Sequence, residues 1–348
     1  MKNKFFIVAA LFISFAVVSC QQKPTPAPVK KTDVSEFFGQ WTIDIQGGGV
    51  GWLEVRQETD YLDADLLWIG GSVVPVANVY LDQDKYLIVT RVDNAVKKRD
   101  EKKVALRTMQ VTNWLKVAKE GADKITGFLY RPKKNGIGLD STSFVGTKLA
   151  PPPAAPDLKA LKFGTPITLF NGKDLTGWKL IDEKQKNGFS VKDGILVTNP
   201  AQVEGQEHIS YGNLRTVQEF EDFNLKIEVN IPAESNSGVY LRGMYEIQVF
   251  DSYKKELDSH NMGALYSRVK PSVNAEKPAG TWQTLDITLC NRHVTVILNG
   301  VNIIDNQPIY GPTGGAMKSD VNTPGPIYLQ GDHGTVSFRN IVLTPIVK

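Results

Sequence analysis

Chemically capable side chains gather in two neighbouring stretches between Asn236 and Asp251. Apolar and polar residues alternate there, and successive side chains of a β-strand point to opposite faces. A carboxyl can move a proton, while a guanidinium, an amide and a phenol can hold sugar hydroxyls or a developing negative charge. The polar face of this predicted hairpin offers these groups on Glu246, Arg242, Gln248 and Tyr240. The pattern fits a sugar site or an ordinary solvated sheet face.

Three more residues join the candidate set: His333, Gln330 and Asp251. His333 lies in a glycine-flanked turn directly after an apolar strand, and such turns place side chains at the end of a sheet. Asp251 lies five residues after Glu246, so a regular strand would point it to the opposite face, and it could instead cap a turn. Arg242 and Glu246 could form a simple cross-strand ion pair, which contributes little when exposed.

Composition narrows the possible functions. The chain has 348 residues, which suits two domains, with 41% hydrophobic and 22% charged residues and a formal charge of +3. No basic field argues for a nucleic-acid partner. The chain has no phosphate loop, dinucleotide fingerprint, zinc-ligand spacing or nucleophile elbow, so no nucleotide cofactor is expected. Cys290 continues an apolar strand pattern, which predicts a buried and unreactive thiol.

The first residues have the features of an export signal. Lys2 and Lys4 precede an apolar run, and Val17-Val18-Ser19-Cys20 resembles a bacterial lipobox. We expect a signal peptide over residues 1–19, a lipid on Cys20, and a location in the bacterial cell envelope, on its periplasmic or outer-membrane face. The alternative is a plain signal peptide with a chance cysteine. Residues 20–33 are rich in proline and lysine and predict an extended tether.

Both halves of the remaining chain predict all-β structure. Short runs of Val, Ile, Thr, Tyr and Trp alternate with glycine and asparagine, and no long amphipathic helix is evident. Residues 34–149 predict an antiparallel meander or small barrel, residues 150–162 a proline-rich linker, and residues 163–348 a two-sheet β-sandwich. Asn299-Gly300 predicts a tight hairpin turn. Residues 72–81 read as one strand and residues 97–103 as a solvated charged loop.

The second half resembles the 3-keto-disaccharide hydrolase family from about residue 163 to residue 346. The matching stretches are Phe170-Asn-Gly-Lys-Asp-Leu-Thr-Gly-Trp178, Asn236-Ser-Gly-Val-Tyr-Leu-Arg242, Tyr245-Glu-Ile-Gln-Val-Phe-Asp251, Gly263-Ala-Leu-Tyr266, Gly280-Thr-Trp-Gln283, Asn299-Gly300, Gly325-Pro-Ile-Tyr-Leu-Gln330, Asp332-His-Gly334 and Phe338-Arg-Asn-Ile341. They occur in family order. The resemblance implies a jelly-roll sandwich of the concanavalin-like lectin and glucanase type.

The resemblance also implies an activity, which is cleavage of a glycoside already oxidised to a ketone at sugar carbon 3. Glu246 and His333 are then expected as base or as ligands of a divalent metal ion. The expected sugar-binding residues are Arg242, Gln248, Tyr240, Gln330 and Asp251. Two alternatives stay open. The chain could be a carbohydrate-binding lipoprotein without catalysis, or a conventional glycosidase that needs a second carboxylate near Glu246.

Overall fold

The computed structural model describes residues 33–101, 104–203 and 208–347, and residues 32–348 form one compact unit. The predicted signal peptide, Cys20 and almost all of the tether lie outside the described residues. Within those ranges the structure is nearly all β, as predicted, with one 3₁₀ turn, η1 (Val34–Phe37), capped by the Asp33 carboxylate. No helix in the described part of the chain is long and apolar enough to cross a membrane.

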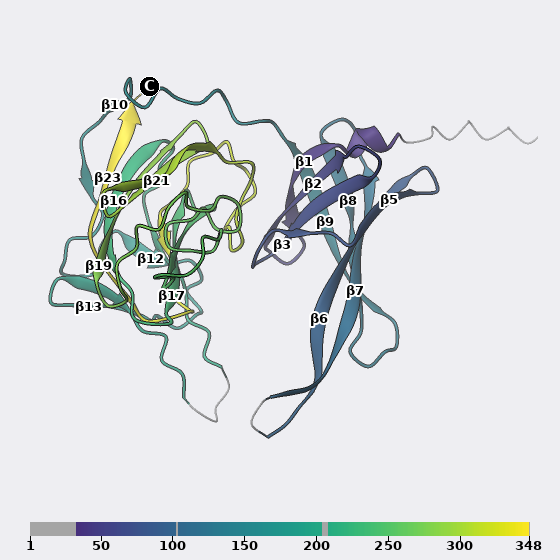
Figure 1. Ribbon diagram of the computed structural model, residues 1–348, viewed down its shortest axis with the longest axis horizontal. Coiled ribbons are helices and arrows are strands. Elements are labelled where there is room, and N and C mark those ends of the chain that lie inside the picture. The colour runs from purple at the N-terminus through teal and green to yellow at the C-terminus, as the bar shows by residue number, and fades with distance from the viewer. Residues whose placement is uncertain (1–32, 102–103, 204–207, 348) are drawn as a thin grey trace, which may run out of the picture. The chain divides into compact units, whose positions relative to one another are not determined.

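The first half folds as a nine-stranded antiparallel sheet in the order β4-β3-β2-β1-β9-β8-β7-β6-β5 (Figure 1). Apart from β1 with β9, every pairing in this sheet joins strands that are consecutive in sequence, which confirms the predicted meander, and β4 and β5 are its two edges. The strands are β1 (Gly39–Ile45), β2 (Val50–Gln57), β3 (Leu62–Trp68), β4 (Val74–Pro75), β5 (Asn78–Asp82), β6 (Tyr86–Arg99), β7 (Ala105–Lys119), β8 (Lys124–Pro132) and β9 (Leu139–Leu149).

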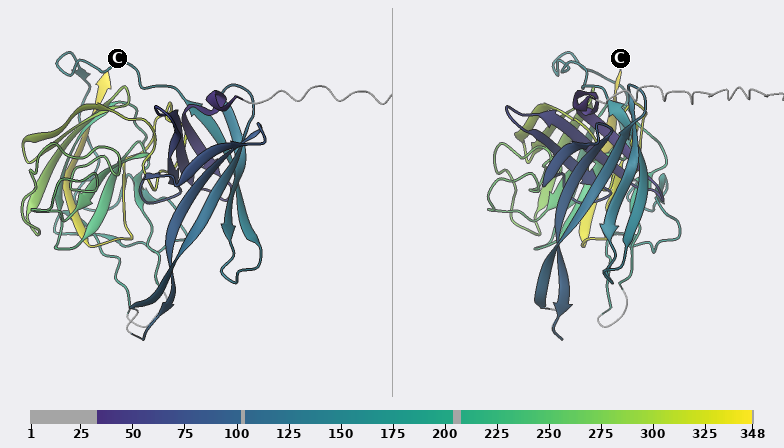
Figure 2. Two further views of the ribbon diagram at one scale, coloured as in Figure 1. Left: turned by 45° about the vertical axis from the view of Figure 1, so that its right-hand side comes forward. Right: turned by 90° about the vertical axis from the view of Figure 1, so that its right-hand side faces the viewer.

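Two details of this sheet differ from the sequence prediction. Strands β6 and β7 form a long twisted hairpin that projects from the sheet (Figures 1 and 2), because cross-strand pairing continues to Arg99 opposite Ala105. The charged run that begins at Lys97 is therefore partly strand rather than loop. The strand predicted over residues 72–81 is two strands, since Pro75 ends β4 and cannot donate a backbone hydrogen bond.

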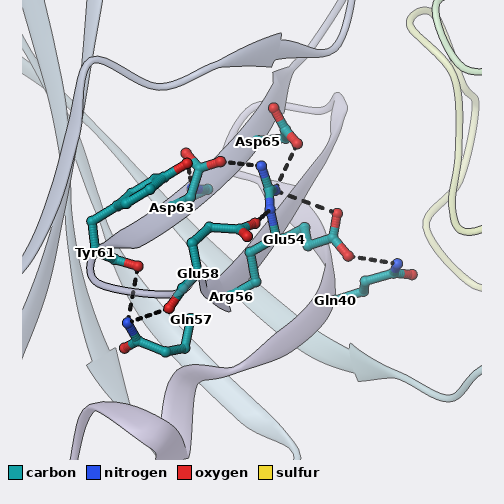
Figure 3. A network of polar contacts seen from close by, with 9 residues as sticks. Gln40, Glu54, Arg56, Gln57, Glu58, Tyr61, Asp63 and Asp65 are labelled. Carbon is teal, nitrogen blue, oxygen red and sulfur yellow. Dashed lines mark hydrogen bonds and ion pairs between the residues drawn. The ribbon is translucent and has the colours of Figure 1, made fainter.

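One face of the N-terminal sheet is polar between β2 and β3. Arg56 lies among four carboxylates there (Figure 3). Its Nη1 lies 2.8 Å from Asp65 Oδ2, its Nε lies 2.9 Å from Glu58 Oε1, and its Nη2 contacts Asp63. The fourth carboxylate, Glu54, is 3.7 Å from Nη1. The Arg56 guanidinium contacts all four acids and so offsets much of their mutual repulsion across the β2–β3 pairing.

The second half forms two sheets (Figures 1 and 2). The larger has the order β13-β14-β23-β16-β19-β20-β21, with β10 and β11 also paired to β23; the smaller has the order β12-β15-β22-β17-β18. The strands are β10 (Lys162–Phe163), β11 (Ile167–Thr168), β12 (Trp178–Leu180), β13 (Phe189–Lys192), β14 (Ile195–Thr198), β15 (Leu214–Thr216), β16 (Phe223–Asn230), β17 (Asn236–Leu241), β18 (Tyr245–Phe250), β19 (Trp282–Cys290), β20 (His293–Leu298), β21 (Val301–Pro308), β22 (Tyr328–Leu329) and β23 (Val336–Val347).

A single apolar core lies between these two sheets. Strand β16 contributes Leu225, Ile227 and Val229, which are buried, while the polar residues between them are half-buried or exposed. The smaller sheet contributes Val239 and Ile247 among others. Alternation therefore decides which side chains each strand buries, and the predicted sandwich is confirmed.

Several local predictions hold in this half. Asn299 and Gly300 have φ of 52° and 83°, as a tight turn between β20 and β21 requires. The Cys290 thiol is buried, as predicted, and its Sγ lies 3.9 Å from Asp222. Trp178 is buried and donates to the Leu169 carbonyl at 2.6 Å, so it anchors the core.

We expect replacement of Arg56 by methionine to destabilise the N-terminal half by about 1 kcal/mol at low salt, because the four carboxylates would lose the one guanidinium that contacts all of them. The loss should shrink in 1 M salt, where such repulsion is screened. Urea unfolding at both salt concentrations measures it. Arg91→Met, which removes a cation bonded to Asp93, is the matched control and should cost less. Equal losses that do not respond to salt would contradict this account.

Candidate active site

The candidate site is built on the hairpin of β17 and β18. Its register places Tyr240 opposite Glu246 and Gly238 opposite Gln248. The chain reverses at Arg242 and Gly243, which have φ of 53° and 67°. Both positive values are typical of the two central residues of a tight hairpin turn. The turn fixes the register, and the register fixes which side chains share a face.

Each strand of the hairpin has one face in the core and one face outside it. Val239, Ile247 and Val249 point inward and are fully buried in the sandwich. By alternation, Tyr240 and Glu246 belong to the other face. On β22, which pairs with β17, Tyr328 lies opposite Tyr240 and therefore belongs to the same outer face. The predicted polar strand face is present.

Glu246 is the most unusual group on this face. Only 4% of the residue is exposed, and its pKa is raised to about 8 because burial disfavours the charged carboxylate, an effect that the hydrogen bond with Tyr240 only partly offsets. Burial in apolar surroundings raises the pKa of a carboxyl in this way at known catalytic sites. At neutral pH most Glu246 side chains are therefore protonated, and a modest change of environment would ionise them.

The hydrogen bonds around Tyr240 agree with a protonated Glu246. The Tyr240 hydroxyl oxygen lies 2.7 Å from Glu246 Oε2 and 2.7 Å from the carbonyl oxygen of Gly314. A tyrosine has one hydroxyl proton, and a carbonyl can only accept. Both contacts are satisfied when Glu246 donates to Tyr240 and Tyr240 donates to Gly314. An ionised Glu246 would compete with that carbonyl for the same proton.

Two glycines make room for these side chains. A Cβ on Gly238 would lie 2.3 Å from Glu246 Oε1, so the glutamate side chain occupies the space above this glycine. Gly315 has φ of 80°, and a Cβ there would lie 2.7 Å from the Tyr240 hydroxyl. The ring of Tyr240 stacks on that of Tyr328 with 3.8 Å between centroids. The face is closely packed around the glutamate.

The face becomes less buried toward the start of β17. Asn236 and Gln330 are half-buried, and the side-chain oxygens Oδ1 and Oε1 are buried without a hydrogen-bond partner in the described structure. The Gln330 amide donates to the Gly238 carbonyl, so this residue lies beside the glycine over which Glu246 leans. Buried acceptors without a donor are costly, and a ligand with hydroxyl groups would satisfy them.

The other predicted residues differ in how close they lie to Glu246 on this face. Gln248 is buried, and its Oε1 accepts from the Val249 amide at 3.0 Å. His333 is exposed, in the turn that packs against Asn236: a Cβ on the adjacent Gly334 would lie 2.9 Å from the Asn236 nitrogen. His333 is therefore at the half-buried end of the face. The Glu246 side chain lies over Gly238, which is two residues along β17 from Asn236, a separation of roughly 7 Å.

Arg242 and Asp251 have visible structural partners. Arg242 is in the hairpin turn, which ends the alternation one residue earlier than the sequence pattern indicates. Its Nη2 donates to the carbonyls of Val321 and Thr323, and it forms no ion pair with Glu246. The Asp251 carboxylate accepts from the Glu234 amide at 3.0 Å, as a turn-capping residue does. Their roles in sugar binding stay predictions.

A divalent metal ion is not supported by the residues around Glu246. No group of three or more His, Cys, Asp or Glu side chains that could hold a metal occurs within residues 33–101, 104–203 and 208–347. A metal ion held by Glu246 and His333 stays a prediction, and no chemical step below depends on it.

One feature beside the face was missed in the sequence. The segment that contains Tyr266 extends the sheet past β18, since its amide donates to the Glu246 carbonyl at 3.0 Å. His260 packs edge-on against Tyr266, and its Nδ1 contacts Asp258, whose pKa is lowered by hydrogen bonds from His260. The Asp-x-His spacing is the signal that could have indicated this pair, which lies two residues apart in the chain.

Solved structures similar to this chain include two proteins of Parabacteroides distasonis, each named "putative glycosyl hydrolase". One is 30% identical, with 55% of this chain and 92% of that chain covered and a TM-score of 0.42. The other is 23% identical, with 52% and 94% covered and a TM-score of 0.44. SCLam, a non-specific endo-β-1,3(4)-glucanase from family GH16, is 11% identical, with 56% and 95% covered and a TM-score of 0.34.

These TM-scores are all below 0.5, so the structural likenesses carry no argument about activity. No curated protein matches the chain. The family model of the 3-keto-α-glucoside-1,2-lyase-like domain matches residues 165–344, which is just over half of the chain, and this match confirms the resemblance seen in the sequence. The first half has no such match. The chain therefore belongs to the family of proteins with a 3-keto-α-glucoside-1,2-lyase-like domain.

Proposed function

We propose that the second half cleaves the glycosidic bond of 3-keto-glycosides or 3-keto-disaccharides, beginning with removal of the proton on sugar carbon 2. The observation that carries this proposal is Glu246, a buried carboxyl whose pKa is raised to about 8. A group with a pKa near the working pH is well suited to take and return a proton. The family match supports the choice of a 3-keto-sugar as substrate.

The chemistry follows from the ketone. A carbonyl at carbon 3 makes the hydrogen on carbon 2 acidic. The ionised Glu246 takes that proton, and the electron pair of the C–H bond forms an enolate. The enolate then expels the glycosidic oxygen from carbon 1, and this oxygen leaves as an alcohol after protonation. Addition of water across the new double bond, hydroxyl to carbon 1 and proton to carbon 2, gives net hydrolysis. Without that addition the outcome is a lyase reaction.

The other residues of the face have supporting roles in this scheme. The unpaired oxygens of Asn236 and Gln330 would accept hydrogen bonds from sugar hydroxyls. Tyr240 contacts Glu246 and would stabilise the ionised carboxylate when the proton has moved. His333, at the half-buried end, could protonate the leaving oxygen. Gln248, Arg242 and Asp251 stay in the predicted sugar-binding set.

A conventional glycosidase mechanism is less well supported by the site. It needs two carboxyl groups on either side of the scissile bond. The raised pKa of Glu246 arises from burial, opposed by the Tyr240 hydrogen bond, and no neighbouring carboxylate contributes to it. The nearest acid in sequence, Asp251, is bonded to the Glu234 amide. One isolated carboxyl suits proton abstraction better than a paired mechanism.

The same proposal includes the cellular setting. The lipobox-like Val17-Val18-Ser19-Cys20 supports export and a lipid on Cys20, which would hold the protein at the membrane of a bacterial cell envelope. The proline-rich residues that follow would give the folded part reach from that surface. A labelled fatty acid that is incorporated into the wild-type protein but not into Cys20→Ala would support this assignment.

Glu246→Gln should lower the rate of aglycone release from a 3-keto-glucoside by about 10²- to 10⁴-fold, because glutamine cannot take up the carbon 2 proton. In the wild-type enzyme kcat/KM should rise with pH through about 8, as Glu246 becomes ionised. The measurement is kcat/KM between pH 6 and 9 with a chromogenic 3-keto-glucoside.

Glu256→Gln is the matched control, since that glutamate is exposed and outside the face. Its pH profile should equal that of the wild type. Substrate binding without turnover by the wild-type protein would favour a non-catalytic carbohydrate-binding protein. Turnover of the unoxidised glucoside at a similar rate would favour a conventional glycosidase.

Glu246 should also make the folded protein less stable as pH rises. Its folded-state pKa is about 8 and its unfolded value is 4.5, so between these values the unfolded chain releases a proton that the native state retains. The free energy of unfolding should fall across that window by an amount on the order of 5 kcal/mol. Urea unfolding from pH 5 to 9 should show this slope in the wild type relative to Glu246→Gln. Parallel curves would show that Glu246 ionises normally.

Gly238→Ala should displace the Glu246 side chain, because the added Cβ would lie 2.3 Å from Oε1. We expect a large loss of kcat and a loss of stability of about 1–3 kcal/mol. Gly164→Ala is the matched control, since the nearest atom to its Cβ is 3.5 Å away. Kinetics and thermal unfolding of both variants test this, and full activity of Gly238→Ala would refute the placement of Glu246.

A further inference from the structure

The outer face of the N-terminal sheet carries aromatic rings where alternation calls for polar side chains. Leu115, Val117 and Ile125 point into the core of this half. The residues between them should therefore face water and be polar. Instead, aromatic side chains occupy this face on three adjacent strands, at Tyr86 on β6, Trp114 on β7, and Phe128 and Tyr130 on β8.

Three of these rings, those of Trp114, Tyr130 and Phe128, form a contiguous row. Trp114 lies opposite Tyr130 in the β7–β8 pairing, with 5.7 Å between ring centroids and 25° between ring planes. Phe128 continues the row at 6.1 Å from Tyr130, and it is 46% exposed. Cross-strand aromatic pairs do stabilise sheets. That role alone does not account for one exposed and three half-buried rings on a face open to solvent.

Two surface grooves meet at the Trp114–Tyr130 pair. The first has a volume of about 650 Å³; Tyr130 and Phe128 line it together with polar groups such as those of Gln46 and Ser143. The second has a volume of about 630 Å³ and is lined by Trp114. Either volume is ample for one or two sugar rings. The aromatic pair thus lies where a chain-like ligand would pass from one groove to the other.

Charge distinguishes the kinds of ligand that would fit. The second groove is lined by Lys97, Arg131, Lys133 and Lys134, and the first groove by Lys116 and the single acid Asp44. Of these cations, Lys133 has a weak ion pair at 4.0 Å with Asp140. Five cations against one acid along the two grooves favour an anionic ligand. Rings beside cations and hydroxyl-bonding groups suit sugar units that carry carboxylates.

We propose that this face binds an acidic polysaccharide, which runs along both grooves and stacks sugar rings against Trp114 and Tyr130. The choice of carbohydrate over other polyanions rests on the proposed function of the second half. The site itself does not depend on that function, since no residue of it takes part in the chemistry at Glu246. Binding there would concentrate the protein on a carbohydrate surface that is distinct from its small substrate.

The test is titration calorimetry of the full chain carrying Glu246→Gln with polygalacturonate, and with laminarin as a neutral comparison. Polygalacturonate should bind, and its affinity should fall with added salt. Trp114→Ala/Tyr130→Ala should weaken binding by about tenfold or more, and Lys133→Glu/Lys134→Glu should weaken it and reduce its salt dependence. Tyr61→Ala is the matched control, because Tyr61 is 58% exposed in the β2–β3 turn, outside both grooves.

Several results would overturn the proposal. These are no binding of polygalacturonate, equal binding of laminarin, tighter binding of a single-stranded DNA of equal charge, or an equal loss in Tyr61→Ala. A wild-type dimer that becomes monomeric in Trp114→Ala/Tyr130→Ala would show that the face binds a second copy. Release of aglycone from a small 3-keto-glucoside should be unchanged when the same double substitution is made in the chain that retains Glu246. This readout separates a failure of the polysaccharide site from a failure of the proposed reaction.

Discussion

Desolvation of the Glu246 carboxyl is the constraint around which the second half is organised. The β17–β18 hairpin presents this group on its outer face, and the surrounding chain then removes it from water. A charged carboxylate would be costly there, so the group holds its proton beside the Tyr240 hydroxyl. Close packing at Gly238 and Gly315 keeps the arrangement fixed. An acid held neutral at physiological pH is an energetic burden that a purely structural residue would not need.

The two halves of the chain use antiparallel sheets in different ways. In the second half, a polar face is buried, and the side-chain oxygens of Asn236 and Gln330 on it have no hydrogen-bond donor among the described residues. In the first half, an apolar and basic face is left open to solvent around Trp114. Both features depart from the usual rule that polar groups lie outside and apolar groups inside. Such departures are the places where a fold supports a function rather than its own stability.

Much of the fold could be predicted from the sequence because alternation and turn residues act locally. The Asn299-Gly300 turn and the buried face of β16 follow from a few consecutive residues. The candidate face was also visible, since Tyr240, Glu246 and Gln248 lie in one hairpin. Long-range effects could not be read in this way. The place of Arg242 depends on carbonyls about 80 residues further on, and the burial of Glu246 depends on segments far away in the chain.

The polar ends of the face were the least predictable part. Asn236 became a candidate only because no donor among the described residues reaches its oxygen, which is a property of the packed domain and not of the residue type. The Asp258–His260 contact escaped notice for the opposite reason, since two residues in an irregular segment give no periodic signal. The length of the projecting β6–β7 hairpin was underestimated, because charged residues such as Lys98 are typical of loops. In the structure they pair across the two strands of this hairpin.

The separation along the chain between Glu246 and its neighbours has a consequence for how the site comes into being. Tyr240 and Glu246 are six residues apart, so they meet as soon as a short hairpin closes. Gly314, whose carbonyl accepts a hydrogen bond from the Tyr240 hydroxyl, is 74 residues from that tyrosine and arrives only when a far longer loop has closed. Until then the glutamate remains in water and titrates as an ordinary acid. Its unusual proton affinity is therefore acquired with the completed domain, so a nascent or partly folded chain would contain the residue without its reactivity.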